Sequence, residues 1–226
     1  MPRTGGRTPY DSANALTGPA RVVYAPMTVG SPIDLWAIVA AVAVAGEYPL
    51  TTGWKDFGLA ADAPSYTHSR EAEGIEYQQP TAPLFESISN IQRQFTAQVA
   101  EIEPDNMKIV ENSAATTQAI AASANKSAQQ KLGFGLYSQM VQYRIALISF
   151  RPGGIVTEPG GVTRPPAVAL VLPTCSLAAE DTEIAFEAGT PVNAPITFST
   201  FPTTGLAAGL EHGYWIFENP GVIAAV

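Results

Sequence analysis

The sequence predicts a mainly β protein with the architecture of a sandwich or barrel. Short apolar runs follow one another along the chain, and nineteen prolines and nineteen glycines supply turns between them. Repeated short runs punctuated by turn residues are typical of all-β folds. Residues 183–187 and 196–199 also alternate between polar and apolar side chains, as half-buried strands do. We expect a single domain over residues 20–226, with one short flanking helix, a long loop and an N-terminal arm.

The predicted strands are the apolar runs, taken in chain order. They cover residues 22–25, 33–45, 143–150, 167–172, 183–186, 196–201 and 214–217. The run 33–45 is the most apolar, yet it contains Asp34 and is shorter than the roughly 20 residues that a membrane-spanning helix needs. We therefore expect a buried strand at 33–45 and no insertion into a membrane.

Residues 84–102 fit two periodicities. Their apolar residues recur at helical spacing, but at period two the polar residues at even positions 90–98 fall on one face. We favour a strand, because two prolines precede the run and Pro104 stands where a new helix would begin. Asp105 would suit the first turn of that helix, which we expect over residues 104–111.

Three other segments lack the pattern of a strand. Residues 1–19 are rich in Gly, Pro, Arg and Ser, which predicts a flexible arm. The connection 48–80 is too long for a simple turn, and its aromatic residues Trp54 and Phe57 suggest that part of it docks against something. The Ala/Ser-rich stretch 113–128 could be helix or loop.

Charge is scarce and unbalanced in this chain. Charged residues make up 14%, against roughly 25% in an ordinary soluble domain. Such a surface fits burial by partners, or a monomer rich in Ser, Thr, Gln and Ala, and we favour self-assembly. The net charge of −8 has the wrong sign for a protein that holds phosphates through Lys and Arg, so we do not expect tight nucleic-acid binding.

The acidic residues that follow Arg164 have no Lys or Arg among them. They are Glu180, Asp181, Glu183, Glu187, Glu211 and Glu218. Such a block is either a solvated face or, on the wall of a channel, a surface that repels a passing polyanion.

The reactive side chains do not predict an enzyme. His68 and His212 are the only histidines, and neither lies in a catalytic motif. Cys175 is the single cysteine, so it cannot form an intrachain disulfide, and we interpret it as a buried inert thiol in a protein assembled in a reducing cytoplasm.

The remaining acidic groups are equally uninformative. Pairs such as Asp181 with Glu183 would share a strand face, but nothing separates their pKa values as a glycosidase requires. His68, Glu71 and Glu73 form a cluster of the kind that binds metals, yet surface charge explains it as well. We expect no catalytic residues, no metal ion and no cofactor.

The order of features along the chain resembles a known family. An apolar early strand precedes GWKDFGLAADAPSY (53–66), EGIEYQQPTAP (73–83), a long strand, AEIEPDNMKIVEN (100–112), and later ITFSTFP (196–202) with a C-terminal strand pair. Over residues 20–226 this order resembles the major tail tube proteins of long-tailed bacteriophages. In that family a Trp-x-x-x-Gly turn, here Trp54 to Gly58, leads into an extended loop.

The resemblance implies a structural subunit. Its strands would pair with those of neighbours in a hexameric ring, and rings would stack into a tube through which DNA passes without tight binding. Ring closure would also remove exposed strand edges. The implied partners are further copies of the chain, tape measure, tail terminator and tail tip proteins. The implied location is the virion tail, assembled in the bacterial host cytoplasm.

A wall that does not hold DNA must be neutral or negative, with Arg93 turned away from it. The predicted lumen-facing residues are Glu86, Asn90, Gln92, Gln94, Thr96 and Gln98. Contacts between rings or subunits are predicted in the arm 1–19 and the loop 57–77. The residues predicted to make these contacts are Arg3, Arg7, Trp54, Phe57, Asp62, Tyr66, His68, Arg70, Glu71, Glu73 and Tyr77.

Two other classes of protein fit the same sequence. A capsid decoration or tail completion protein would share its β-rich, acidic character. A carbohydrate-binding β-sandwich would expose aromatic residues on one sheet, and Trp36, Trp54 and Trp215 would be the ones to examine.

Overall fold

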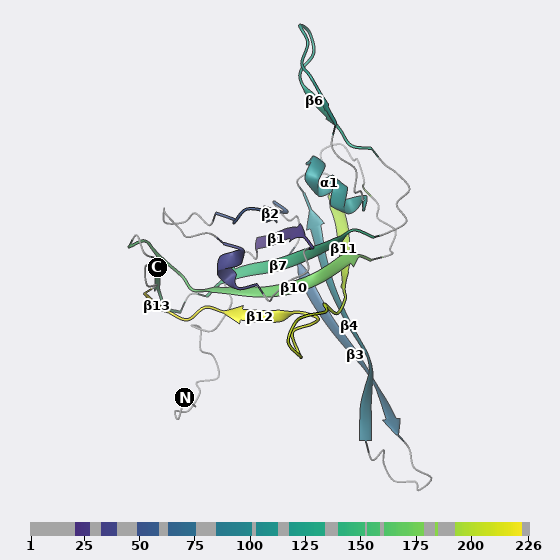
Figure 1. Ribbon diagram of the computed structural model, residues 1–226, viewed down its shortest axis with the longest axis vertical. Helices are drawn as coiled ribbons and strands as arrows, with labels where there is room; N and C mark the ends of the chain where they lie inside the picture. Colours follow the sequence, from purple (N-terminus) through teal and green to yellow (C-terminus); the bar gives the residue numbers. More distant parts are fainter. Residues whose placement is uncertain are drawn as a thin grey trace. The chain divides into compact units, whose positions relative to one another are not determined.

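A computed structural model shows a mainly β, sandwich-like protein with one α-helix, as predicted (Figure 1). The residues it describes are 21–27, 33–39, 49–58, 63–75, 85–100, 103–112, 118–133, 140–151, 153–158, 161–178, 184 and 193–222. Seven strand pairs in these ranges are antiparallel: β1–β2, β3–β4, β4–β11, β5–β6, β8–β9, β10–β11 and β10–β12. Strands β13 and β8 pair in parallel.

The chain forms two compact units. The first comprises Met1–Asp56, Arg144–Pro173 and Thr204–Val226, and the second comprises Phe57–Tyr143 and Thr174–Thr203. Each unit therefore combines segments that are distant in sequence. The single domain expected over residues 20–226 stays a prediction.

The first unit is built around four strands in the order β2-β1-β7-β10, with β12 also paired to β10. Their bounds are β1 (Arg21–Pro26), β2 (Lys55–Asp56), β7 (Gln142–Phe150), β10 (Ala167–Leu177) and β12 (Tyr214–Phe217). A smaller sheet joins β8 (Val156–Thr157), β9 (Thr163–Arg164) and β13 (Gly221–Val222). The strands predicted at 22–25, 143–150, 167–172 and 214–217 are confirmed.

A core cluster of the first unit lies against strands β7 and β10. Strand β10 is buried along almost its whole length, as expected of a strand covered on both faces. Alternate residues of β7 and β10 point into a cluster that is closed by the segment around Leu35. The buried members are Val23, Leu35, Ile38, Val39, Ala146, Ile148, Ala167, Ala169 and Val171.

The strand predicted at 33–45 is wrong where the structure describes it. Leu35–Ala37 is a short 3-10 helix, η2, because the Asp34 carboxylate caps it by accepting a hydrogen bond from the Ala37 N–H (2.8 Å). The Tyr214 hydroxyl fixes the entry to this turn, since it accepts from the Ile33 N–H (2.8 Å) and donates to the Ile33 carbonyl (3.0 Å). Hydropathy found the buried segment but not its backbone conformation.

The second unit is organised by a long antiparallel hairpin, visible in Figure 1 as a twisted ribbon. Its strands are β3 (Ser65–Ile75) and β4 (Phe85–Val99), and β11 (Ala194–Thr200) pairs with the other edge of β4. The end of β10 then pairs with β11. The strand expected within 84–102 and the strand expected at 196–201 are both confirmed.

Aromatic rings form the core of the second unit. Phe198 is fully buried, and its ring centroid lies 6.3 Å from those of Phe57, Phe95 and Tyr143. Burial raises the pKa of Tyr143 to about 12. The predicted helix is confirmed as α1 (Pro104–Val110), and its buried Asn106 donates to the Phe57 carbonyl (3.2 Å).

The long loop predicted at 57–77 is wrong. Eleven of its residues, Ser65–Ile75, form strand β3 and pair with β4. From Ser65 to Glu71 every side chain is exposed or half-buried, so neither face of this part of the strand carries the apolar alternation that identifies a strand in sequence. Backbone hydrogen bonds to β4 hold this segment as a strand instead.

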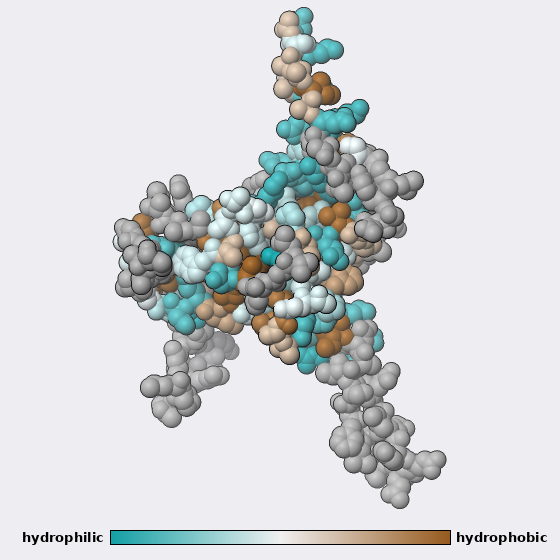
Figure 2. Space-filling view, in the orientation of Figure 1, coloured by the Kyte–Doolittle hydropathy of each residue, from teal (hydrophilic) through white to brown (hydrophobic). Residues whose placement is uncertain are grey.

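The Ala/Ser-rich segment is neither helix nor simple loop where it is described. Residues Gln118–Ile120 and Gln129–Lys131 pair as β5 and β6 of a small hairpin whose residues are exposed. Figure 2 shows both hydrophilic and hydrophobic residues on this hairpin, at the top of the view. The arm 1–19 lies outside the described residues, as does the strand expected at 183–186 apart from Ile184.

Removing the central ring of the second core should destabilise the protein. We expect Phe198→Ala to lower the free energy of unfolding by about 3–5 kcal/mol, because the fully buried ring leaves a cavity among its aromatic neighbours. Phe201→Ala is the control, since that ring is 43% exposed and should change stability by only about 0.5 kcal/mol. Guanidinium unfolding of both variants would decide, and equal losses would contradict this account of the core.

Candidate functional site

The pairing of β3, β4 and β11 sorts side chains onto two faces. Ser65 lies opposite Thr96 and Thr67 lies opposite Gln94, and the side chains of these two pairs share one face. The intervening pair, Tyr66 and Phe95, points to the other face. Strand β11 continues the pattern, with Thr197 opposite Thr96. One face carries hydroxyl and amide groups, and we call it the polar face. Its members are Ser65, Thr67, Ser69, Glu71, Gln92, Gln94, Thr96, Gln98, Pro195, Thr197 and Ser199.

The polar face has no cationic side chain among these members, and Glu71 is its single charge. Its side chains are exposed or half-buried rather than buried. The Thr96 and Thr197 hydroxyls lie 3.4 Å apart across the strands, within hydrogen-bonding distance. Hydroxyls and amides donate and accept hydrogen bonds while remaining neutral. The face can therefore contact water or a polar solute without attracting phosphate.

Four of the predicted lumen-facing residues come together on this face: Gln92 and Gln94, Thr96 and Gln98. Side chains of the other two, Asn90 and Glu86, lie outside the described set. The strand register nevertheless indicates how the position of Glu86 relates to the polar face. Glu71 pairs with Asn90 but Ala72 pairs with Ile88, so a one-residue bulge interrupts the alternation between Asn90 and Glu86. Alternation counted from Gln92 therefore does not place Glu86 on the polar face.

The opposite face of the hairpin is basic, and we call it the arginine face. It consists of Tyr66, His68, Arg70, Ile91 and Arg93. Arg93 lies opposite His68, and Arg70 lies opposite Ile91. The predicted separation of Arg93 from the glutamine residues is confirmed. Farther along β4, Phe95 lies on the same side of the sheet, opposite Phe198 of β11, and is buried.

His68 is held in its neutral form on the arginine face. Desolvation and the positive charges of Arg70 and Arg93 lower the pKa of His68. The Arg70 Nε–H donates a hydrogen bond to His68 Nε2 (3.2 Å), which a protonated imidazole could not accept. On the same face, burial raises the pKa of Tyr66, although Arg93 opposes the shift.

The residues predicted to contact other subunits have different positions. His68, Arg70 and Glu71 are exposed on β3, and Tyr66 is half-buried there. Phe57 is buried in the aromatic core, so its ring is not available to a neighbour. Trp54 packs partly buried against the core of the first unit. Arg3, Arg7, Asp62 and Tyr77 lie outside the described residues, as does the side chain of Glu73.

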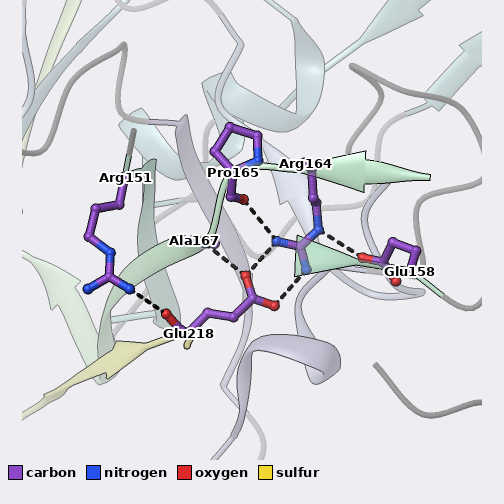
Figure 3. A network of polar contacts seen from close by, with 6 residues as sticks. All are labelled: Arg151, Glu158, Arg164, Pro165, Ala167 and Glu218. Atoms are coloured by element: carbon purple, nitrogen blue, oxygen red, sulfur yellow. Dashed lines mark hydrogen bonds and ion pairs between the residues drawn. The ribbon is translucent and has the colours of Figure 1, made fainter. Parts of the chain in front are cut away.

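A buried ionic network in the first unit was not predicted (Figure 3). The Arg164 Nε–H donates to Glu158 (2.8 Å), and its two terminal nitrogens donate to both carboxylate oxygens of Glu218. Glu218 also accepts from the Ala167 N–H (2.8 Å), and its own carbonyl accepts from Arg151 (2.8 Å). The guanidinium lies 5.4 Å from the centroid of the Trp36 ring.

This network fastens the residue after β12 to β9 and β10. Burial alone would lower the pKa of Arg164, but hydrogen bonds and charge from Glu218 and Glu158 raise it overall, so the residue stays ionised. Glu218 therefore belongs to a structural clamp and not to a solvated acidic surface. Sequence patterns could not separate it from the other acids that follow Arg164, because its partner lies 54 residues away.

The described residues contain little that could perform chemistry. Cys175 is fully buried, and burial raises the pKa of its thiol, which opposes formation of a nucleophilic thiolate. In the ranges given above, no three His, Cys, Asp or Glu side chains gather as metal ligands. Those ranges also include no helix long and apolar enough to cross a membrane.

No known family model matches the sequence, and no curated protein matches it significantly. What the protein does must therefore be inferred from its own residues.

Breaking the ionic clamp should destabilise the first unit. Arg164→Met would leave Glu158 and Glu218 as buried carboxylates without their cation, which costs about 3–5 kcal/mol. The matched control is Arg21→Met, because the Arg21–Asp56 pair is about one-third exposed and such pairs contribute about 0–1 kcal/mol. Chemical denaturation measures both, and a loss for Arg164→Met as small as that of the control would count against a clamp.

The Cys175 thiol should be inert in the folded protein. Its raised pKa keeps it protonated at neutral and mildly alkaline pH, and burial excludes the reagent. We expect no reaction with Ellman's reagent at pH 8 under native conditions and one thiol per chain in guanidinium. Rapid native labelling would mean that the end of β10 is accessible.

Proposed function

We propose that this chain is a structural subunit of a bacteriophage tail tube, in which hexameric rings stack around a channel that conducts DNA. The observation that carries the proposal is the polar face, a set of side chains spread over β3, β4 and β11 that has no Lys or Arg and is neutral apart from Glu71. We infer that this face lines the channel.

Electrostatics explains why such a face suits a DNA conduit. Duplex DNA carries one negative charge per roughly 1.7 Å of its axis, and each Lys or Arg that neutralises a phosphate adds affinity by releasing counterions. A lining of glutamine, serine and threonine offers no such site. Glu71 and the net charge of −8 would oppose adhesion further.

The distribution of charge between the two faces supports the same orientation. Arg70 and Arg93 occupy the face opposite the glutamine residues, so a tube with the polar face inward turns both cations away from DNA. The reverse orientation would place two arginines and a histidine from every subunit in the path of the nucleic acid. Strand alternation thus separates a surface without cations, which does not bind phosphate, from a surface with two arginines, which would bind it.

The strand order also favours assembly by edge pairing. In the second unit, strand β3 ends the order β11-β4-β3, and in the first unit β2, which has two residues, ends the order β2-β1-β7-β10. A terminal strand offers backbone N–H and C=O groups to a neighbour, and a head-to-tail contact that closes by rotation makes a ring. Charged residues on β3, such as Arg70 and Glu71, would discourage unspecific pairing.

In this proposal the subunit is not an enzyme and binds no cofactor. Its partners are copies of itself and the tape measure, terminator and tip proteins of the tail. It assembles in the host cytoplasm, becomes part of the virion tail and does not insert into a membrane.

The alternative of a carbohydrate-binding sandwich has one observation in its favour. Trp215 is 50% exposed, and its ring stacks on the exposed Phe217 with centroids 6.2 Å apart. The other two tryptophans are engaged elsewhere: the Arg164 guanidinium lies over one face of Trp36, which is 39% exposed, and Trp54 packs on the core. We therefore favour the tube.

Negative-stain electron microscopy of the purified protein tests the proposal directly. Long tubes with a central channel are the expected result. Persistent monomers or isolated rings at high protein concentration would refute a tail tube and favour a capsid decoration or tail completion protein.

Lysines on the polar face should make the tube retain DNA. Tubes of Gln92→Lys/Gln94→Lys would be assembled with short labelled duplex DNA, pelleted and assayed for bound DNA. We expect retention that is far above wild type and falls steeply with salt, because the lysines repeat in every subunit.

The matched control is Gln129→Lys/Gln130→Lys, which makes the same chemical change on the exposed strand β6. The control should assemble normally and retain much less DNA than the polar-face variant. Equal retention by the two variants would show that the polar face does not line the channel.

A further inference from the structure

We propose that the arginine face, made of Tyr66, His68, Arg70, Ile91 and Arg93, binds the acidic block 180–187 of a second copy of this chain. The inference deepens the proposed function, because it names the contact through which copies recognise one another. It rests on the self-assembly proposed above.

The first observation is a concentration of positive charge without carboxylates. In the described residues Arg21 pairs with Asp56, Lys108 with Asp105, and Arg164 with two glutamates. Neither Arg70 nor Arg93 has an ion pair with any described residue. Glu71 follows Arg70 in sequence, but strand alternation places it on the polar face. Two like charges on neighbouring strands cost free energy unless an anion joins them.

The second observation is that guanidinium donors on this face lack acceptors. Arg93 Nε is buried and has no hydrogen-bond partner, which is costly for a polar group withdrawn from water. Arg70 uses Nε to bind His68, and no described residue accepts from its terminal nitrogens. Guanidinium groups suit carboxylates because they can donate two parallel hydrogen bonds.

The geometry keeps the donors in place for such a ligand. His68 is neutral and accepts from Arg70, so it orients that guanidinium without adding a third charge. The Thr200 hydroxyl donates to the Arg93 carbonyl (3.4 Å) and holds that part of β4 beside β11. Ile91, which lies opposite Arg70 and two residues before Arg93, is 39% exposed and adds an apolar surface to the face. An extended segment with alternating acidic and apolar residues would match this surface.

The chain itself supplies such a segment. The sequence Glu180-Asp181-Thr182-Glu183-Ile184-Ala185-Phe186-Glu187 has four carboxylates, two large apolar residues and no Lys or Arg. Of the other acids after Arg164, Glu218 belongs to the buried clamp. Glu211 accepts the Gly209 N–H (2.7 Å), and hydrogen bonds from its own backbone N–H and from that of Gly209 lower its pKa. Four of the six acids after Arg164 lie in the block 180–187, which makes it the densest acidic run in this part of the sequence.

Charge complementarity also explains why the ligand belongs to a second copy. Two chains with a net charge of −8 each repel one another at long range. Association then needs a local surface of opposite sign, and an acidic block in one copy facing the arginine face of the next supplies it. Such a contact is head-to-tail, which is the kind that closes into rings or continues into filaments.

The test uses the full-length protein and a labelled peptide of residues 178–189. The double variant Arg70→Gln/Arg93→Gln removes both cations, and Lys126→Gln/Lys131→Gln is the control with the same charge change on the exposed hairpin. Circular dichroism would first establish that each variant is folded. A second peptide carries amides in place of the four carboxylates.

Fluorescence anisotropy should show that the acidic peptide binds wild type and the control alike. We expect its affinity to fall at least ten-fold for Arg70→Gln/Arg93→Gln, for the amide peptide and in high salt. Equal binding to the arginine variant would overturn the inference. Tighter binding of short duplex DNA than of the peptide at the same face would overturn it too, because the face would then recognise nucleic acid.

Electron microscopy of the same proteins separates this inference from the proposed function. Peptide binding through Arg70 and Arg93 in a protein that forms no tubes would refute the tail tube and leave the contact standing. Normal tubes from the arginine variant, together with unchanged peptide binding, would refute the contact and leave the tail tube standing.

Discussion

The backbone pairing of β4 with β3 on one side and β11 on the other is the constraint on which the second unit depends. Period-two alternation along three paired strands decides, residue by residue, which side chains reach the aromatic core and which reach solvent. Phe95 and Phe198 face each other in this register and anchor the buried side. The same register that buries these rings assigns Gln94 and Thr96 to the polar face, so core and surface cannot be changed independently.

The two units combine polar groups with burial in different ways. In the first, Arg164 and its two glutamates lie inside the protein, where every charge needs a partner, and the network holds the end of β12 in place. In the second, charge is kept at the surface and divided between faces: hydroxyls and amides on one, Arg70 and Arg93 on the other. Pairing and hydrogen bonds offset the cost of burying the first set of charges, and exposure makes the second set available for binding.

Sequence patterns predicted the parts of this protein whose local signal and tertiary role agree. The strands of the cores, the strand within 84–102 and the helix begun by Pro104 follow from apolar runs, alternation and proline placement. The patterns failed at Leu35, where the Asp34 cap turned a buried segment into a 3-10 helix. They also failed over Ser65–Glu71, where side chains that are exposed or half-buried on both faces leave no alternation to detect. Alternation did group Gln92, Gln94, Thr96 and Gln98, but the clamp on Arg164 could not be foreseen because its partners are distant in sequence.

The bulge between Asn90 and Ile88 has a consequence for how this hairpin can vary in evolution. An insertion or deletion of one residue between Ile91 and Val99 would exchange the two sides of β4, moving arginine to the glutamine side and exposing Phe95. Substitutions there can be conservative, but the number of residues is fixed. On the far side of the bulge the alternation is already reset, so the ribbon can lengthen or shorten in homologous chains while both surfaces keep their chemistry.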